Sequence, residues 1–179
     1  TAPFMLRRLK TDKSIISDLP DKIVCNRYVH LTPEQAALYG KTLQSIMDKI
    51  KALTNEEGRQ KKTALVLRLI TALKQICNSP SLYVKSQASL PDSGKGNALL
   101  ELIDECREAG RKALIFTQYA EMGEKLQAWL AKATGRRPDF LHGGVTVKAR
   151  AKMVDDFQTN PDNDILIISL KAGGTGLNL

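Results

Sequence analysis

The chain has 179 residues, of which 42% are hydrophobic and 26% charged, a composition typical of a soluble globular protein with a sizeable core. No apolar run is long enough for a membrane span, two isolated histidines give little support for a metal site, and three widely spaced cysteines predict neither a disulfide framework nor structural zinc. The 27 Lys and Arg residues against 19 Asp and Glu give a net charge of +8, which favours polyanionic partners such as nucleic acid, although each basic cluster is equally typical of a solvated surface.

The first 31 residues are expected to lead into the domain and to contribute its first strand. Apolar side chains fall mainly on odd positions between Ile23 and Leu31, which is the alternation of a strand with one buried face. The charges at the N-terminus follow its short apolar stretch instead of preceding it, so we expect no secretory leader. We interpret the chain as a segment of a longer protein.

Two helices are predicted over 32–85. Thr32 is expected to cap the first of them, with a proline in the first turn and Gln35 closing a capping box. Apolar residues recur at helical spacing over 36–50, so one face of this helix must be buried. A polar break is expected at 54–62.

The second helix carries an apolar stripe from Val66 to Cys77 and is expected to end before Pro80. Serine, proline and glycine residues then make 86–96 the best candidate for an internal linker. The sequence therefore predicts a helical region that is set apart from the C-terminal half of the chain.

After this linker, short apolar segments alternate with amphipathic helices. Strands are predicted at 113–116, 140–141 and 165–168, with helices before and between them. Strands that are apolar on both faces and alternate with helices predict a parallel sheet covered on both sides. The expected fold class is therefore α/β.

In such sheets, ligands bind beyond the carboxyl ends of the strands. Those ends carry 117–119, 142–144 and a glycine-rich loop over 170–176. Three glycines among four residues suit a backbone that approaches phosphate closely, but a plain strand-to-helix turn has the same composition. Thr117 and Gln118 can likewise be simple helix caps.

The order and spacing of these motifs resemble the second RecA-like lobe of superfamily-two helicases. The matching segments are 112–119, 140–144, Arg150 with 157–158, and 169–179. Further segments resemble the Swi/Snf remodelling ATPases in particular: 4–10, 19–22, 31–35 with Tyr39, and 73–78 with Pro80. Ser79 stands where eukaryotic members commonly carry His, which suggests a bacterial or archaeal member.

The resemblance implies a RecA-like parallel sheet flanked by helices, as in the second lobe of P-loop NTPase-type motors, with an N-terminal helical protrusion. The implied boundaries are 1–31 for the segment that enters the lobe and its first strand, 32–85 for the protrusion, 86–96 for the linker, and 97–179 for the lobe, which stops before the last helicase motif.

The resemblance also implies a division of the site residues. Those on the DNA side are Arg7, Arg8, Lys10, Thr117, Gln118, His142, Gly143 and Lys171. Those in the nucleotide cleft are Gly173, Gly174, Thr175, Gly176 and Asn178. The chain has no Gly-x-x-x-x-Gly-Lys-[Ser/Thr] motif, no acid pair for magnesium and no arginine motif for the γ-phosphate, so no catalytic residue or metal ligand is assigned to it.

The function expected from the resemblance is that of the second lobe of a duplex-DNA-stimulated ATPase, which couples ATP hydrolysis to translocation along double-stranded DNA and to remodelling of protein–DNA complexes. ATP and Mg²⁺ would be bound mainly by the first lobe, and the 179 residues alone would be inactive. Expected partners are double-stranded DNA, the N-terminal RecA-like lobe of the same protein, and DNA-bound proteins or RNA polymerase, but no membrane. The location would be the cytoplasm, associated with the nucleoid, in a bacterium or archaeon and the nucleus in a eukaryote.

Three alternatives remain open at this point. One is an RNA helicase lobe, which the helical protrusion disfavours. Another is a nucleic-acid- or protein-binding module without ATPase coupling. The third is a small-molecule Rossmann enzyme, although no Gly-x-Gly-x-x-Gly follows the first α/β strand.

Overall fold

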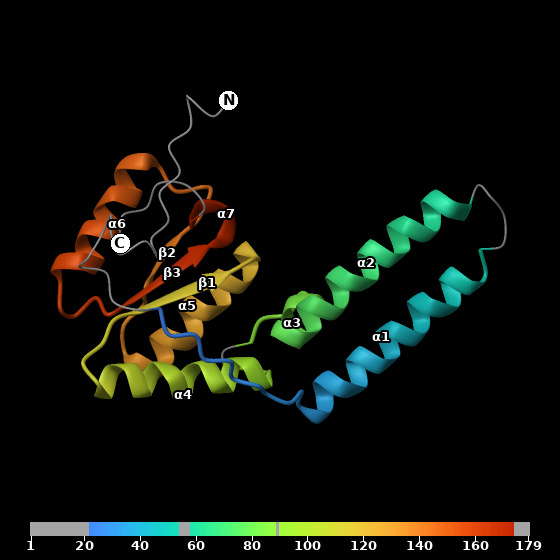
Figure 1. The fold of residues 1–179 in the computed structure, drawn as a ribbon, viewed down its shortest axis with the longest axis horizontal. Coiled ribbons are helices and arrows are strands. Elements are labelled where there is room, and N and C mark those ends of the chain that lie inside the picture. The colour runs from blue at the N-terminus through green and yellow to red at the C-terminus, as the bar shows by residue number, and fades with distance from the viewer. Residues whose placement is uncertain (1–21, 54–57, 89, 174–179) are drawn as a thin grey trace.

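In the computed structural model, residues 22–53, 58–88 and 90–173 are described. They form a lobe with a central sheet, and a long hairpin of two helices projects from it (Figure 1). The predicted fold class, α/β with a parallel sheet flanked by helices and a helical region before it, is confirmed.

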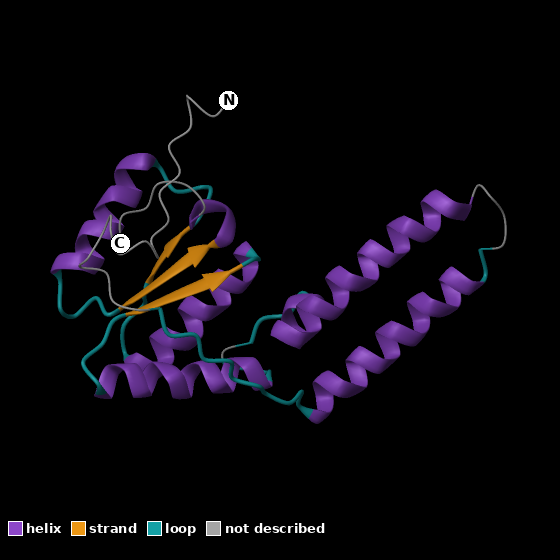
Figure 2. Cartoon of the chain, in the orientation of Figure 1, coloured by secondary structure: helices purple, strands orange, loops and turns teal. Residues whose placement is uncertain are grey.

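The described sheet contains three parallel strands in the order β1-β3-β2. They are β1 (Ala113–Thr117), β2 (Asp139–Leu141) and β3 (Ile165–Ser169). Thr117 pairs with Ser169 and Leu141 with Ile168, so all three strands end at the same edge, as their arrowheads show in Figure 2.

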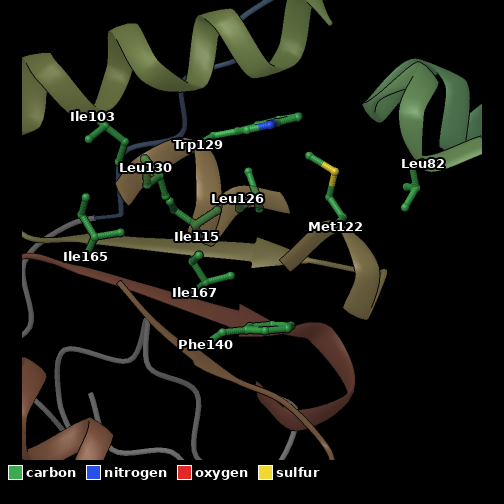
Figure 3. Packing of buried hydrophobic residues seen from close by; sticks show 10 residues of the cluster. All are labelled: Leu82, Ile103, Ile115, Met122, Leu126, Trp129, Leu130, Phe140, Ile165 and Ile167. Carbon is green, nitrogen blue, oxygen red and sulfur yellow. The ribbon is translucent and has the colours of Figure 1, made fainter. Parts of the chain in front are cut away.

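Helices cover both faces of the central strand β3, whose five residues are all buried. One face packs against α4 (Gly94–Glu108) and α5 (Ala120–Thr134), and the other against α6 (Val147–Thr159) and α7 (Leu170–Gly173). The first core cluster, shown in Figure 3, consists of Leu82, Ile103, Ile115, Met122, Leu126, Trp129, Leu130, Phe140, Ile165 and Ile167. The second consists of Leu141, Phe157, Leu166, Ile168 and Ala172.

The expectation that the sheet is covered on both sides is wrong for strand β1. Leu114 and Phe116 point to the same face as Leu166 and Ile168, yet they are 39% and 52% exposed. The reason is that β1 lies at the edge of the described sheet, whereas α6 packs on that face over β2. An apolar strand predicts burial only where a helix reaches it.

The prediction of a strand between Ile23 and Leu31 is also wrong. Residues 22–31 form no strand, and Ile23 and Tyr28 are 85% and 91% exposed. This segment runs along α4 instead, where Arg27 forms ion pairs with Glu101 and Glu105, both at 3.2 Å. Alternating apolar residues make a strand only when a neighbouring strand accepts their backbone hydrogen bonds.

The hairpin consists of α1 (Pro33–Lys51) and α2 (Gly58–Asn78). The predicted capping box is confirmed, since the Thr32 side chain accepts from the Gln35 backbone and the Gln35 side chain accepts from the Thr32 backbone. The predicted polar break is too long, because α2 already includes 58–62; residues 54–57 lie outside the described part. The α2 stripe is only partly buried, with Leu69 inside and Ile70 exposed.

The connection from the hairpin back to the lobe is shorter than the predicted linker. The helix α2 ends before Pro80, as expected, and the short helix α3 (Pro80–Tyr83) comes next. Ser93 already caps α4 by accepting from the Gly96 backbone at 3.0 Å, so 94–96 belong to a helix. The carboxylate of Asp92 accepts from the hydroxyl of Ser79 at 2.6 Å and from the Ser81 backbone at 2.9 Å, which anchors this connection.

Candidate functional site

The carboxyl edge of the sheet brings together the three segments that the sequence marked as ligand-facing. Residues 117–119 follow β1, residues 142–144 follow β2, and α7 follows β3. Because the strands are parallel and end together, these segments open on one edge although they are far apart in the chain.

After β1, Gln118 is the residue whose side chain reaches solvent. Thr117 is buried, and its hydroxyl donates to the carbonyl oxygen of Tyr119 at 3.4 Å. The N-cap of α5 is Tyr119, without a side-chain hydrogen bond, so neither Thr117 nor Gln118 caps this helix. The helix-capping alternative is therefore wrong, and of the two predicted DNA-side residues Gln118 is the one free to contact a ligand.

After β2, the loop with His142 and Gly143 is held in place from within the lobe. The His142 ring lies on Phe140 with 4.8 Å between ring centroids, and its Nδ1 accepts from the Gly144 backbone at 3.2 Å. Arg150 in α6 donates from Nη2 to the carbonyl oxygen of His142 at 3.0 Å. Arg150 thus fixes this loop from α6, and Gly143 is exposed on the surface.

After β3, the structure differs from the predicted loop over 170–176, since 170–173 form the helical turn α7. Lys171 is exposed there. A Cβ atom added at Gly173 would lie 3.0 Å from Cγ2 of Ile168 and 3.2 Å from Cε1 of Phe116. A side chain at Gly173 would therefore require Ile168 and Phe116 to shift slightly. The assignment of Gly173 to the nucleotide cleft stays a prediction.

Several predicted site residues lie outside the described part of the chain. On the DNA side these are Arg7, Arg8 and Lys10; in the nucleotide cleft they are Gly174, Thr175, Gly176 and Asn178. Their assignments stay predictions.

Sequence reasoning missed a groove between the hairpin and the end of β1. Two adjoining hollows of about 490 and 250 Å³ share Asn78, Lys95 and Gln118 in their lining. We call them together the edge groove; its polar lining consists of Tyr39, Lys74, Asn78, Lys95, Thr117, Gln118 and Tyr119. Lys74 and Asn78 lie four residues apart on α2, a spacing that places them on one helix face and that the sequence alone could have flagged.

The opposite edge of the sheet carries the perturbed carboxylate Asp156. The pKa of Asp156 lies below its ordinary value because the side-chain amides of Asn160 and Asn163 donate to it, and Arg136 and Lys152 add favourable charge, against an opposing effect of burial. Asn163 donates to its Oδ2 at 2.6 Å just before β3 begins. This carboxylate stabilises the fold away from the candidate site.

The described residues add no metal site, membrane-spanning helix or disulfide to this picture. No three His, Cys, Asp or Glu side chains there are grouped closely enough to hold a metal ion. None of the helices is long and apolar enough to cross a membrane, again counting the described residues. The cysteines Cys25, Cys77 and Cys106 are all free thiols.

Comparison with known proteins defines the class of this lobe. The model of the helicase conserved C-terminal domain matches residues 94–179, and that of the SNF2-related domain matches residues 1–82. The chain is 35% identical to the solved SWI2/SNF2 ATPase C-terminal domain of Sulfolobus solfataricus, with a TM-score of 0.79 over 89% of this chain and 68% of that one. The chain belongs to the SWI2/SNF2 family of ATPases and corresponds to their C-terminal lobe, as its sequence motifs predicted.

Two further relatives bear on what the lobe does. The chain is 39% identical over 180 residues to the "Putative ATP-dependent helicase/translocase YwqA" of Bacillus subtilis, and the match covers 99% of this chain but 19% of that protein. It is 36% identical to the Sulfolobus solfataricus SWI2/SNF2 ATPase core solved in complex with double-stranded DNA, with a TM-score of 0.76, covering 94% of this chain and 35% of that one. The chain therefore spans about a fifth of the first relative and a third of the second.

Proposed function

We propose that this chain is the C-terminal lobe of a DNA-stimulated ATPase that couples ATP hydrolysis to translocation along double-stranded DNA and to remodelling of protein–DNA complexes. The observation that supports it best is the carboxyl edge, where Gln118, Gly143 and Lys171 are all exposed. An amide, a glycine backbone and a lysine are suitable donors for DNA phosphates. The relative solved with double-stranded DNA supports the same class of ligand.

Each exposed residue of this edge would contribute a different contact to one DNA strand. Lys171 supplies charge, Gln118 donates from its amide, and Gly143 offers a backbone N–H that no side chain obstructs. Thr117 and His142 act from beneath, because the first is buried and the second is fixed by its ring contact and by Gly144. Arg7, Arg8 and Lys10 are proposed to extend the same DNA side.

The nucleotide would lie between this lobe and the N-terminal RecA-like lobe of the same protein, with 173–178 contributing to the cleft. Magnesium prefers carboxylate oxygens and phosphates. No carboxylate occurs in 117–119, 142–144 or 170–173, so these segments do not fit a magnesium site and no step through the metal is assigned to them. We propose that the other lobe holds most of ATP and Mg²⁺, and that the 179 residues alone hydrolyse no ATP.

Other partners are part of the same proposal. A translocating lobe of this kind would act on DNA-bound proteins or on RNA polymerase. We propose a nucleoid-associated location in the cytoplasm for a bacterial or archaeal protein and a nuclear one for a eukaryotic protein.

The test uses the full-length protein and measures ATP hydrolysis with and without duplex DNA. Lys171→Ala should raise the DNA concentration needed for half-maximal stimulation and lower the salt slope of DNA binding by about one, because one phosphate contact is lost. Lys132→Ala removes the same charge from the last turn of α5, away from the carboxyl edge, and should change neither quantity. Parallel titrations with double-stranded RNA address the RNA helicase alternative. An ATPase indifferent to duplex DNA would contradict the proposed function.

A further inference from the structure

All charged residues that line the edge groove are positive. Its two charged residues are Lys74 from α2 and Lys95 from α4, and no Asp or Glu lines either hollow. The groove around α5 is different, because there Lys85 forms an ion pair with Glu121 at 2.5 Å and Lys125 donates to the carbonyl oxygen of Ser86 at 2.6 Å. Lysines of that groove are satisfied within the chain, whereas the edge groove has an excess of positive charge. The hairpin groove with Lys41, Lys49 and Arg68 is also basic, so what distinguishes the edge groove is its positive charge together with Gln118 of the carboxyl edge in its lining.

Several polar groups of the edge groove have no partner in the described part of the chain. Lys74 forms no ion pair there, and neither the Gln118 amide nor the hydroxyls of Tyr39 and Tyr119 make a hydrogen bond within it. The Lys95 ammonium group donates one hydrogen bond, to Oδ1 of Asn78 at 3.3 Å. A cation, an amide and two phenols are donors that suit the oxygen atoms of a phosphodiester backbone.

The two walls of the groove are fixed to each other by a buried side chain. Gln35 is fully buried, and its Nε2 donates to the carbonyl oxygens of Ile76 at 2.7 Å and Cys77 at 3.3 Å, shortly after Lys74 in α2. Its Oε1 accepts from the Gly94 backbone at 3.1 Å, directly before Lys95 in α4. The Gln35 amide thus holds the end of α2, which carries Lys74, against the start of α4, which carries Lys95.

Further contacts make the same joint tight. Ser93 donates to the carbonyl oxygen of Asn78 at 2.6 Å. A Cβ atom at Gly94 would lie 2.0 Å from the carbonyl oxygen of His30, so only glycine fits where the chain crosses the start of α4. The groove is therefore a preformed feature of the fold, and binding would not require its walls to be ordered first.

The groove also continues the candidate site. Gln118 follows β1 at the carboxyl edge and lines both hollows, so a strand that contacts the edge at Gln118 can run on between the hairpin and the lobe. We propose that the edge groove is a phosphate-binding channel for one strand of duplex DNA, with Lys74 as its main cation and Gln35 as the residue that positions its walls. This inference rests on the proposed function and adds the helical hairpin to the DNA path.

The experiment compares two lysines of the hairpin in the full-length protein. Lys74 lies in the edge groove; Lys41 lines another groove of the same hairpin, which shares no lining residue with it. Each is changed to Ala, which favours helix, so that the fold is not threatened. The probe is a fluorescein-labelled duplex, and its affinity is measured by anisotropy at several salt concentrations, with circular dichroism as a check of folding.

For Lys74→Ala we expect a several-fold weaker affinity, a salt slope lower by about one, and a higher DNA requirement for ATPase stimulation with the rate at saturating DNA retained. Lys74→Arg keeps the charge and should restore the slope. Lys41→Ala should leave both quantities at their original values. Gln35→Met, which fills the same space without hydrogen bonds, should weaken DNA binding with the salt slope unchanged, because it displaces the walls without removing a charge.

Equal losses for Lys74→Ala and Lys41→Ala would show that DNA senses only the overall charge of the hairpin, and would overturn the proposal. Unchanged DNA binding in Lys74→Ala would also overturn the channel proposal. In that case the proposed function would still hold if duplex DNA stimulates the ATPase of the unmodified protein. If the unmodified protein binds duplex DNA through Lys74 but is not stimulated by it, the proposed function fails and the channel stands.

Discussion

The lobe and the helical hairpin are held together by different forces. In the lobe, two apolar clusters pack on opposite faces of the sheet and every residue of β3 is buried. The hairpin buries fewer apolar side chains, namely Ile46 of α1 and Leu69, Ala72 and Ile76 of α2, together with the polar Gln35 and Thr42. At the root of the hairpin, Gln35, Ser93 and Asp92 connect it to the lobe through hydrogen bonds.

The two parts should therefore respond differently to substitution. Apolar burial has no preferred direction and scales with area, so it determines how stable the lobe is. Hydrogen bonds are directional, so they determine the angle at which the hairpin leaves the lobe. We expect substitutions in the lobe to change global stability and substitutions at the root to change the placement of the hairpin.

The largest expected effect is that of Gly123→Ala in α5. A Cβ atom at this position would lie 2.1 Å from Cζ of Phe140, so α5 could no longer rest on β2. Such overpacking in a rigid core should cost about 3 kcal/mol of unfolding free energy, measured by urea denaturation of the 179-residue chain.

Gly40→Ala in α1 is the matched control, since the added Cβ would meet nothing within 4 Å. Alanine is the better helix former, so this variant should be more stable by about 0.5–1 kcal/mol. Equal stability of the two variants would contradict the contrast between a close-packed lobe and an open hairpin.

The next largest effect is expected from Gln35→Met. Methionine leaves the carbonyl oxygens of Ile76 and Cys77 and the backbone N–H groups of Thr32 and Gly94 without their partner, at a cost of about 2 kcal/mol. The loss should be local: hydrogen exchange should accelerate at the start of α1, in the last turn of α2 and in the first turn of α4, while β3 keeps its protection.

Gln44→Met serves as the control on the same helix, because the Gln44 amide donates only to Oδ1 of Asp48, in an exposed pair. It should leave the exchange pattern unchanged. Faster exchange throughout the lobe in Gln35→Met would mean that the root is part of the main core, and the distinction between root and lobe would be lost.

The smallest effect concerns the acid stability of the lobe. Because the folded-state pKa of Asp156 is lowered, its contribution is present above the unfolded-state pKa of about 3.9 and is lost as the pH falls through the folded-state value. Asp156→Asn should therefore melt at a lower temperature than the parent chain at neutral pH, and the difference should shrink below about pH 4. The exposed neighbour Asp155, changed to Asn, should show no such convergence in thermal melts recorded across the same range.

Local patterns in this sequence predicted local structure well. The Thr32 capping box, the end of α2 before Pro80 and all three strands of the sheet depend on residues that are adjacent or a few positions apart. The shared carboxyl edge was also predictable, because parallel strands with helical connections must end together. Only the family resemblance separated the SWI2/SNF2 ATPases from other α/β proteins.

Two of the failed predictions depended on a distant neighbour. Residues 23–31 have the alternation of a strand but meet helix α4, and Phe116 is apolar but lies at an edge of the described sheet where α6 does not cover it.

By itself, the sequence determined the α/β class, several helix ends and the sheet edge at which the predicted site residues lie, because backbone propensity and capping depend on neighbouring residues. Only the tertiary structure decided that Lys74 and Lys95 line one groove, since the amide that joins their helices comes from Gln35, 59 positions before its partner Gly94. Hydrogen bonds between such distant residues form only once the apolar core has brought their helices together. For this reason, no local sequence pattern predicts them.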